Sequence, residues 1–235
     1  MSREELLKIA KPILFNTEMV QALIDGRKTV TRRIIKYKYS NTYFKFRESK
    51  YGTEFVEMQN NVEGETFGKN EDGTTWHKLL GYIVPKSPYK VGDILYVRET
   101  FFHGDILDSN EDIVESDITI YATDDTEKYD IDYCDIKWKP SIHMPKEFAR
   151  IFLKVTNVRV ERLKDITEEQ ATKEGCVDNR GFIHSHEDEY SNSHSALEVF
   201  IKLWDSTIKK QDIGKYDWGS NPWVWVIEFE VIQQN

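Results

Sequence analysis

The segment GRKTVTRR, from Gly26 to Arg33, gathers cationic and hydroxyl side chains around one turn. Its cations are Arg27, Lys28, Arg32 and Arg33, and its hydroxyls belong to Thr29 and Thr31. Cations at this density can hold an anionic or nucleotide-like ligand, although a solvated turn would carry the same residue types. The formal net charge of the chain is -9, which opposes loose binding to nucleic acid. A local basic site on an acidic protein therefore suits a small ligand better than a long duplex.

Two elements must position this segment. Asn16 is a good N-cap, and apolar residues recur at helical spacing from Met19 to Ile24, before the helix stop Gly26. The β-branched run from Thr29 to Ile35 predicts a strand. In a strand, positions 28 and 31 would point to opposite faces, so Lys28 must belong to the turn if its amine is to reach Thr31.

The rest of the pattern predicts an α+β fold that is mainly β, a small β-barrel with packed helices. Strands are expected at 94–97, 118–121, 148–160 with a change of phase at Asn157, and 222–231. Short helices are expected at 165–175, with Thr167 as N-cap, and at 196–205, and a hairpin insertion at 36–90.

Composition bounds the class of protein. Hydrophobic residues make up 39% of the 235 residues, which excludes general disorder. No apolar run is long enough for a membrane span, and the first residues lack the pattern of a secretion signal, so we expect a cytoplasmic protein. The two isolated cysteines, Cys134 and Cys176, fit a reducing compartment.

Three separated segments together resemble the ASCH domain family, whose fold is a PUA-like β-barrel. The first carries Gly26, Lys28, Thr31 and Arg33 at the spacing of the family motif. The second is KVGDILYV at 90–97, and the third is VIEF at 226–229, with the segment ITEEQATKEG between them. The resemblance implies a single domain over 1–235, with insertions at about 40–88, 104–140 and 178–195. The whole chain resembles the longer ASCH proteins of phages and prophages, which would place it in the host cytoplasm.

One bacterial member of that family is an amidohydrolase that removes the acyl group from N4-acetylcytidine. The resemblance assigns its catalytic lysine to Lys28, its threonine nucleophile to Thr31 and its glutamate to Glu174. A threonine hydroxyl needs a base, and a lysine can serve when burial and nearby cations favour its neutral amine. The carboxyl of Glu174 would protonate the leaving amine or guide the hydrolytic water. Ligand contacts would come from Arg27, Arg32 and Arg33.

Two other functions fit the same residues. The first is a binding module for RNA, DNA or a modified nucleotide, in which the four cations hold phosphate and nothing is cleaved. The second is a phage accessory protein that binds a host protein through the acidic segment 105–135, which has twelve Asp and Glu residues against one lysine. No cofactor or metal is predicted, because the spacing of His184, His186 and His194 fits no zinc pattern and 108–119 lacks the glycine and glutamate of a calcium loop.

Overall fold

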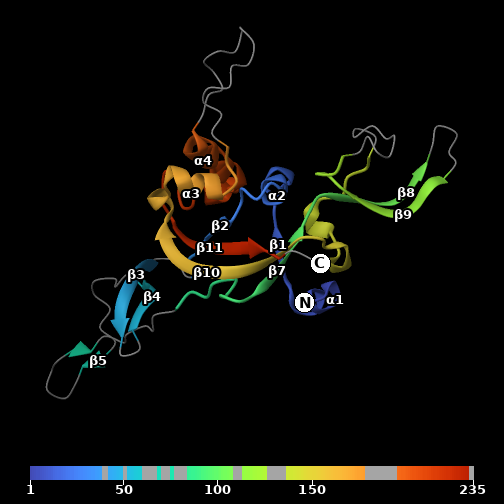
Figure 1. Ribbon diagram of the computed structural model, residues 1–235. Coiled ribbons are helices and arrows are strands. Elements are labelled where there is room, and N and C mark those ends of the chain that lie inside the picture. The colour runs from blue at the N-terminus through green and yellow to red at the C-terminus, as the bar shows by residue number, and fades with distance from the viewer. Residues whose placement is uncertain are drawn as a thin grey trace, which may run out of the picture.

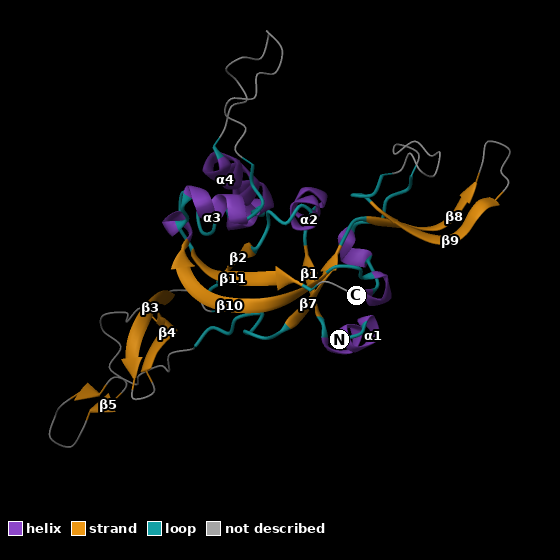
Figure 2. Ribbon diagram, viewed as in Figure 1, coloured by secondary structure: helices purple, strands orange, loops and turns teal. Residues whose placement is uncertain are grey.

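The computed structural model of the chain describes residues 1–38, 42–49, 52–59, 68–69, 75–76, 84–107, 113–125, 136–177 and 195–232. These residues form a mixed α+β structure with more strand than helix, in which helices flank a central five-stranded sheet (Figures 1 and 2). The sheet contains, in spatial order, β1 (Lys11–Leu14), β7 (Ile94–Arg98), β10 (Phe152–Arg162), β11 (Trp223–Val231) and β2 (Val30–Ile34).

The remaining elements lie around this sheet. The α-helices are α1 (Arg3–Ile9), α2 (Thr17–Ile24), α3 (Glu168–Lys173) and α4 (Ala196–Thr207). Short 3-10 helices occupy Ser141–His143, Lys146–Phe148, Leu163–Asp165 and Lys210–Asp212. Three antiparallel pairs form sheets of their own: β3 (Thr42–Ser49) with β4 (Gly52–Gln59), β5 (Gly68–Lys69) with β6 (Thr75–Trp76), and β8 (Phe101–Leu107) with β9 (Ile113–Tyr121). The β3–β4 and β8–β9 hairpins project from opposite sides of the molecule (Figure 1).

The strand order leaves the central sheet open, with β1 and β2 as its two edges. We expected a closed barrel, but within the described residues β1 pairs only with β7, in parallel, and β2 only with β11, antiparallel. A side chain joins the two edges instead, because Arg33 on β2 donates from Nη2 to the carbonyl of Leu14 on β1 at 3.0 Å. Pro12 in β1 fits an edge position, where no backbone donor is needed.

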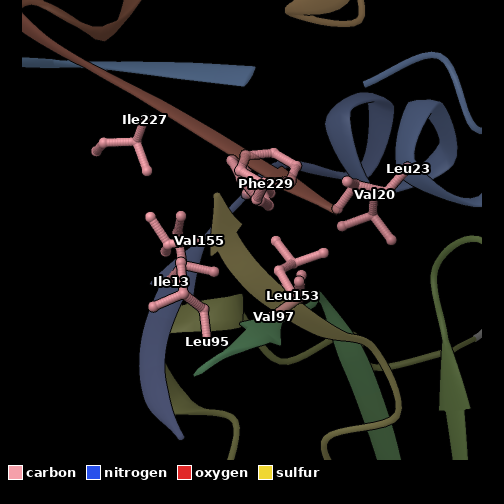
Figure 3. Packing of buried hydrophobic residues seen from close by; sticks show 10 residues of the cluster. Ile13, Val20, Leu23, Leu95, Val97, Leu153, Val155, Ile227 and Phe229 are labelled. Atoms are coloured by element: carbon pink, nitrogen blue, oxygen red, sulfur yellow. The ribbon is translucent and has the colours of Figure 1, made fainter. Parts of the chain in front are cut away.

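Both faces of the sheet are buried, because alternate residues of its central strands point to opposite sides. On one face α2 packs over an aliphatic cluster from four strands, with Val20 and Leu23 against Leu153, Ile227 and Phe229 (Figure 3). On the other face α3 and α4 cover a second cluster that includes Val30, Val226, Phe200 and Trp204.

The strands predicted at the centre of the fold are confirmed with shifted ends. The expected bulge lies between Val155 and Asn157 on β10, while Phe148 belongs to a 3-10 helix and not to the strand. The strand expected at 118–121 is longer, beginning at Ile113. The elements that the sequence pattern did not predict include α1, which begins at a capping box on Ser2, and the strands β1 and β8.

Candidate functional site

The turn that holds Lys28 is fixed by its backbone. Helix α2 begins at its N-cap Asn16, as predicted, and ends before Gly26, whose φ of 72° is in the left-handed region that glycine tolerates. The amide of Lys28 donates to the carbonyl of Ala22, and the amide of Thr29 donates to the carbonyl of Lys173 in α3, both at 2.9 Å. Lys28 therefore lies in the turn before β2, as its proposed contact with Thr31 requires.

Thr31 lies on β2, directly opposite Ile227 of β11. Its side chain is 2% exposed. In the part of the chain that the structure describes, its hydroxyl has no hydrogen-bond partner. Thr31 lines a cavity, so its hydroxyl oxygen is open to a ligand or a water molecule.

Glu174 reaches the site because α3 ends against α2. It is the C-cap residue of α3, and Gly175 follows it with a φ of 97°. A Cβ atom at position 175 would meet the Cβ of Ala22 at 2.8 Å, so only glycine permits this approach. The carboxyl group of Glu174 is thereby held beside Lys28, 146 residues away in the sequence.

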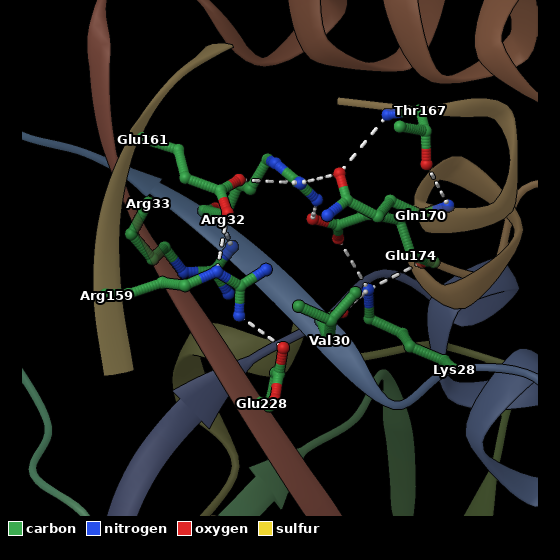
Figure 4. Close-up of polar contacts among 10 residues, drawn as sticks. All are labelled: Lys28, Val30, Arg32, Arg33, Arg159, Glu161, Thr167, Gln170, Glu174 and Glu228. Atoms are coloured by element: carbon green, nitrogen blue, oxygen red, sulfur yellow. Dashed lines mark hydrogen bonds and ion pairs between the residues drawn. The ribbon is translucent and has the colours of Figure 1, made fainter. Parts of the chain in front are cut away.

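Lys28 and Glu174 form a buried ion pair (Figure 4). The side chain of Lys28 is 1% exposed, and its Nζ lies 3.1 Å from Oε2 of Glu174. The same Nζ donates to the carbonyls of Val30 at 2.9 Å and of Glu174 at 2.6 Å. Three acceptors match the three N–H donors of an ammonium group, so the resting pair is cation and carboxylate.

The electrostatic environment makes this ammonium easier to deprotonate than an exposed lysine. Burial lowers the pKa of Lys28, and the charge and hydrogen bond of Glu174 oppose that shift. Nearby cations were expected to lower this pKa as well. The charge of Arg33 does lower it, but burial lowers it more. The arrangement therefore combines a stable ion pair with a lysine that can give up its proton below the usual pH.

Arg32 holds the other side of Glu174. Its Nη1 donates to Oε1 of Glu174 at 3.0 Å, and its Nη2 donates to Oε1 of Gln170 at 2.9 Å and lies 3.3 Å from Oε2 of Glu161. We expected Arg32 to contact a ligand, whereas its buried guanidinium is occupied with positioning this carboxylate. Its Nε is buried and has no hydrogen-bond partner among the described residues.

Gln170 and Glu161 were not predicted as site residues. Gln170 stands four residues before Glu174, one helical turn away, so the two side chains share a face of α3. That spacing was a usable signal. Glu161 also pairs with Arg159, and Arg159 pairs with Glu228. A chain of alternating basic and acidic side chains thus leads from Arg32 to Glu228 (Figure 4).

The three predicted catalytic residues border one cavity of about 180 Å³, which we name the Thr31 pocket. Lys28, Thr31 and Glu174 line it, together with Arg32 and Arg33. Aromatic and polar walls complete it: Phe15 and Asn16 after β1, and Phe200, Trp204 and Thr207 on α4. The pocket lies where the two edges of the sheet face each other, and its size suits a single ring rather than a duplex.

Arg27 alone among the predicted ligand-binding residues lies outside this pocket. Its guanidinium pairs with Asp25 at 2.7 Å and donates to the carbonyl of Gly175 at 2.9 Å. It borders a second cavity of about 740 Å³ between α2 and α4, which we name the α2–α4 cleft. Three of the four cations of the segment 26–33 therefore line the Thr31 pocket: Lys28, Arg32 and Arg33.

Several other predicted features fall outside the described residues. These include His184, His186 and His194, the calcium-like segment from Asp108 to Asp112, and Cys134 with much of the acidic segment. Among the residues that the structure describes, no group of three or more metal-binding side chains occurs.

Comparison of the chain with protein families, with curated proteins and with solved structures found no match. Within the described ranges, no helix has both the length and the apolar character needed to cross a lipid bilayer.

Proposed function

We propose that the protein is an amidohydrolase that removes the acyl group from an N4-acylated cytidine or a related modified nucleoside, with Thr31 as the nucleophile. The observation that carries this proposal is the shared pocket: an unpartnered hydroxyl, a buried lysine of lowered pKa and a fixed carboxylate border one small cavity. The same three residues were assigned from the resemblance to ASCH proteins. On this proposal the open sheet is a variant of the PUA-like fold, and the protein acts in the cytoplasm.

The reaction proceeds in two steps. The Thr31 hydroxyl oxygen attacks the carbonyl carbon of the acyl group, and its proton passes to the neutral amine of Lys28. The tetrahedral intermediate collapses, the bond to the N4 nitrogen breaks, and that nitrogen takes the proton back from the Lys28 ammonium and leaves as the cytosine amine. Water then attacks the acyl ester of Thr31, which releases the carboxylic acid and restores the hydroxyl.

In this mechanism Lys28 transfers the proton and Glu174 positions Lys28. Lys28 can act as a base only after its ammonium group loses a proton. Three hydrogen bonds oppose that loss, and burial favours it. Glu174 lies against Lys28 on one oxygen and Arg32 on the other, so its carboxylate stays fixed while the lysine changes charge. A positioned acid or base of this kind contributes about 10² to 10⁴ in rate.

The strand edge supplies a donor for the oxyanion. The amide of Phe229 donates to the carbonyl of Thr29, and the amide of Ile35 donates to the carbonyl of Trp223. In an antiparallel ladder only alternate residues bond to a given neighbour, so the odd-numbered residues of β2 face β11. The amide of Arg32 therefore faces the open edge, next to Thr31, where it can donate to the developing negative charge.

The test compares cytidine release from N4-acetylcytidine by the wild-type protein and three variants. Thr31→Val removes the hydroxyl at nearly constant shape and should abolish turnover, and Thr31→Ser should retain part of it. Thr29→Val is the matched control, because Thr29 is an exposed threonine on the same turn and should leave turnover unchanged. Mass spectrometry of the wild-type protein during turnover should find the acyl group on Thr31.

Turnover that survives Thr31→Val would assign the chemistry to another residue. A failure to hydrolyse any of several N4-acylated nucleosides, together with retained binding of cytidine, would replace the hydrolase with a nucleotide-binding module.

A further inference from the structure

The α2–α4 cleft adjoins the Thr31 pocket. Met19 and Leu203 border both cavities, one from each of the helices that form the walls. Residues 175–177 after α3 also line the cleft, as do residues 122–124 after β9. Its volume of about 740 Å³ is roughly four times the 180 Å³ of the Thr31 pocket. A ligand bound at Thr31 can therefore extend into the cleft between the two helices.

The walls of this cleft are largely apolar. They include Met19, Ala122, Val177, Val199 and Leu203. Cys176 adds a neutral thiol, because burial raises its pKa to about 12.

The charged side chains around the cleft are paired or stand at its rim. Arg27 is paired with Asp25. Asp124 pairs with Arg150 at 2.6 Å and accepts from the amide of Tyr121 at 3.0 Å. Glu18 is exposed on α2, where its carboxylate opposes an anion. An uncharged, apolar group fits these walls better than a phosphate.

We propose that the α2–α4 cleft receives the acyl chain of the substrate, so the preferred substrates are nucleosides whose N4-acyl group is longer than acetyl. This inference rests on the proposed hydrolase function. It assigns the pyrimidine ring to the Thr31 pocket, where Phe15, Phe200 and Trp204 offer aromatic faces and Arg33 and Asn16 offer polar groups for the ring edge. The scissile carbonyl then lies between the two cavities, and water splits the amide into the acid and the amine.

The inference predicts a dependence on chain length. Burial of each added methylene should raise kcat/KM about fourfold until the chain outgrows the cleft. N4-butyrylcytidine, with two more methylenes than N4-acetylcytidine, should therefore react about tenfold faster or more at equal low concentration.

The experiment measures kcat/KM for N4-acetyl-, N4-butyryl- and N4-hexanoylcytidine. Val199→Trp fills the cleft from α4 and should remove most of the gain on the longer chains, with the acetyl substrate nearly unaffected. Val177→Trp fills it from the opposite wall, at a half-exposed position, and should do the same if the first variant folds poorly. Ser206→Trp adds the same ring to an exposed position of α4 outside the cleft and is the matched control.

The outcomes separate this inference from the function on which it rests. Equal kcat/KM for all three substrates, or an equal loss on all three in both tryptophan variants of the cleft, would overturn the acyl-chain assignment while the hydrolase stands. Absence of turnover for every chain length, with the protein folded, would remove the hydrolase and the acyl site together.

Discussion

At the scale of single residues, the buried ion pair of Lys28 and Glu174 is the central feature of the candidate site. Taking two charges out of water is costly, and the structure offsets this cost with three acceptors for the lysine and two cationic partners for the carboxylate. Removing one partner leaves the other charge uncompensated. Activity and stability should therefore both report on this pair.

The first prediction concerns pH. On the proposed mechanism, catalysis requires the neutral amine of Lys28. The value of kcat/KM should therefore rise with pH, and its inflection should fall below the ordinary lysine value of 10.5 because burial lowers the pKa of Lys28. Stability should also rise with pH. The folded protein binds the Lys28 proton more weakly than the unfolded chain does, so the free energy of unfolding should increase as pH rises towards 10.5. A rate profile that stays flat up to pH 10.5 would contradict the role of Lys28 as base.

The second prediction concerns the carboxylate. Glu174→Gln leaves Lys28 buried without its countercharge and Arg32 with Glu161 as its remaining ion-pair partner, and the free energy of unfolding should fall by about 3–5 kcal/mol at neutral pH. Urea denaturation measures the loss. Glu169→Gln on the same helix is the control, because that side chain is 77% exposed and pairs only with Lys173 among the contacts described, and its midpoint should not move measurably.

At the scale of elements, the site depends on how closely α3 approaches α2. Glycine at position 175 allows the contact with Ala22 that carries Glu174 to Lys28. The third prediction follows from it. Gly175→Ala should lower both stability and activity, because it combines a left-handed φ with a Cβ contact of 2.8 Å to Ala22. Thermal unfolding and the N4-acetylcytidine assay measure the two effects.

Two further variants divide that loss into its causes. Gly214→Ala is the control for conformation alone, because Gly214 has a φ of 81° with nothing within 4 Å of the added Cβ, and it should cost about 1 kcal/mol. Ala22→Gly combined with Gly175→Ala should recover activity by removing the clash. If the double variant is no better than the single one, close helix approach is not the cause.

The elements that build the site could be predicted from sequence because each carries a local signal. Short-range patterns reveal the helix ends. The helices α2 and α3 begin at the capping side chains of Asn16 and Thr167, and α2 ends before Gly26, which has a left-handed conformation. The partners of Arg32 could not be found this way. Strand periodicity gives the face of the sheet on which Arg32 lies but not its burial. Its contact with Glu161 reaches across β11, which lies between β2 and β10 in the sheet. The open sheet was missed because β1 has only four residues and pairs in parallel with a strand 80 residues later.

At the scale of the whole molecule, the central sheet carries the stability on which the site depends. The fourth prediction compares it with an outlying hairpin. Ile227→Ala removes a fully buried side chain beside β2 and should cost about 2–5 kcal/mol. Ile113→Ala, on β9 at 61% exposure, should change stability by less than about 0.5 kcal/mol. Chemical denaturation distinguishes them, and equal losses would mean that the β8–β9 hairpin is coupled to the central sheet.

The pairing of β2 with β11 has a consequence for protein synthesis. Thr31 lies near the start of the chain, whereas the strand beside it spans Trp223–Val231. The ribosome makes β2 first, so this strand emerges long before β11 and lacks its partner until then. A nascent or prematurely terminated chain that lacks β11 should therefore have no hydrolytic activity and should depend on chaperones to stay dispersed.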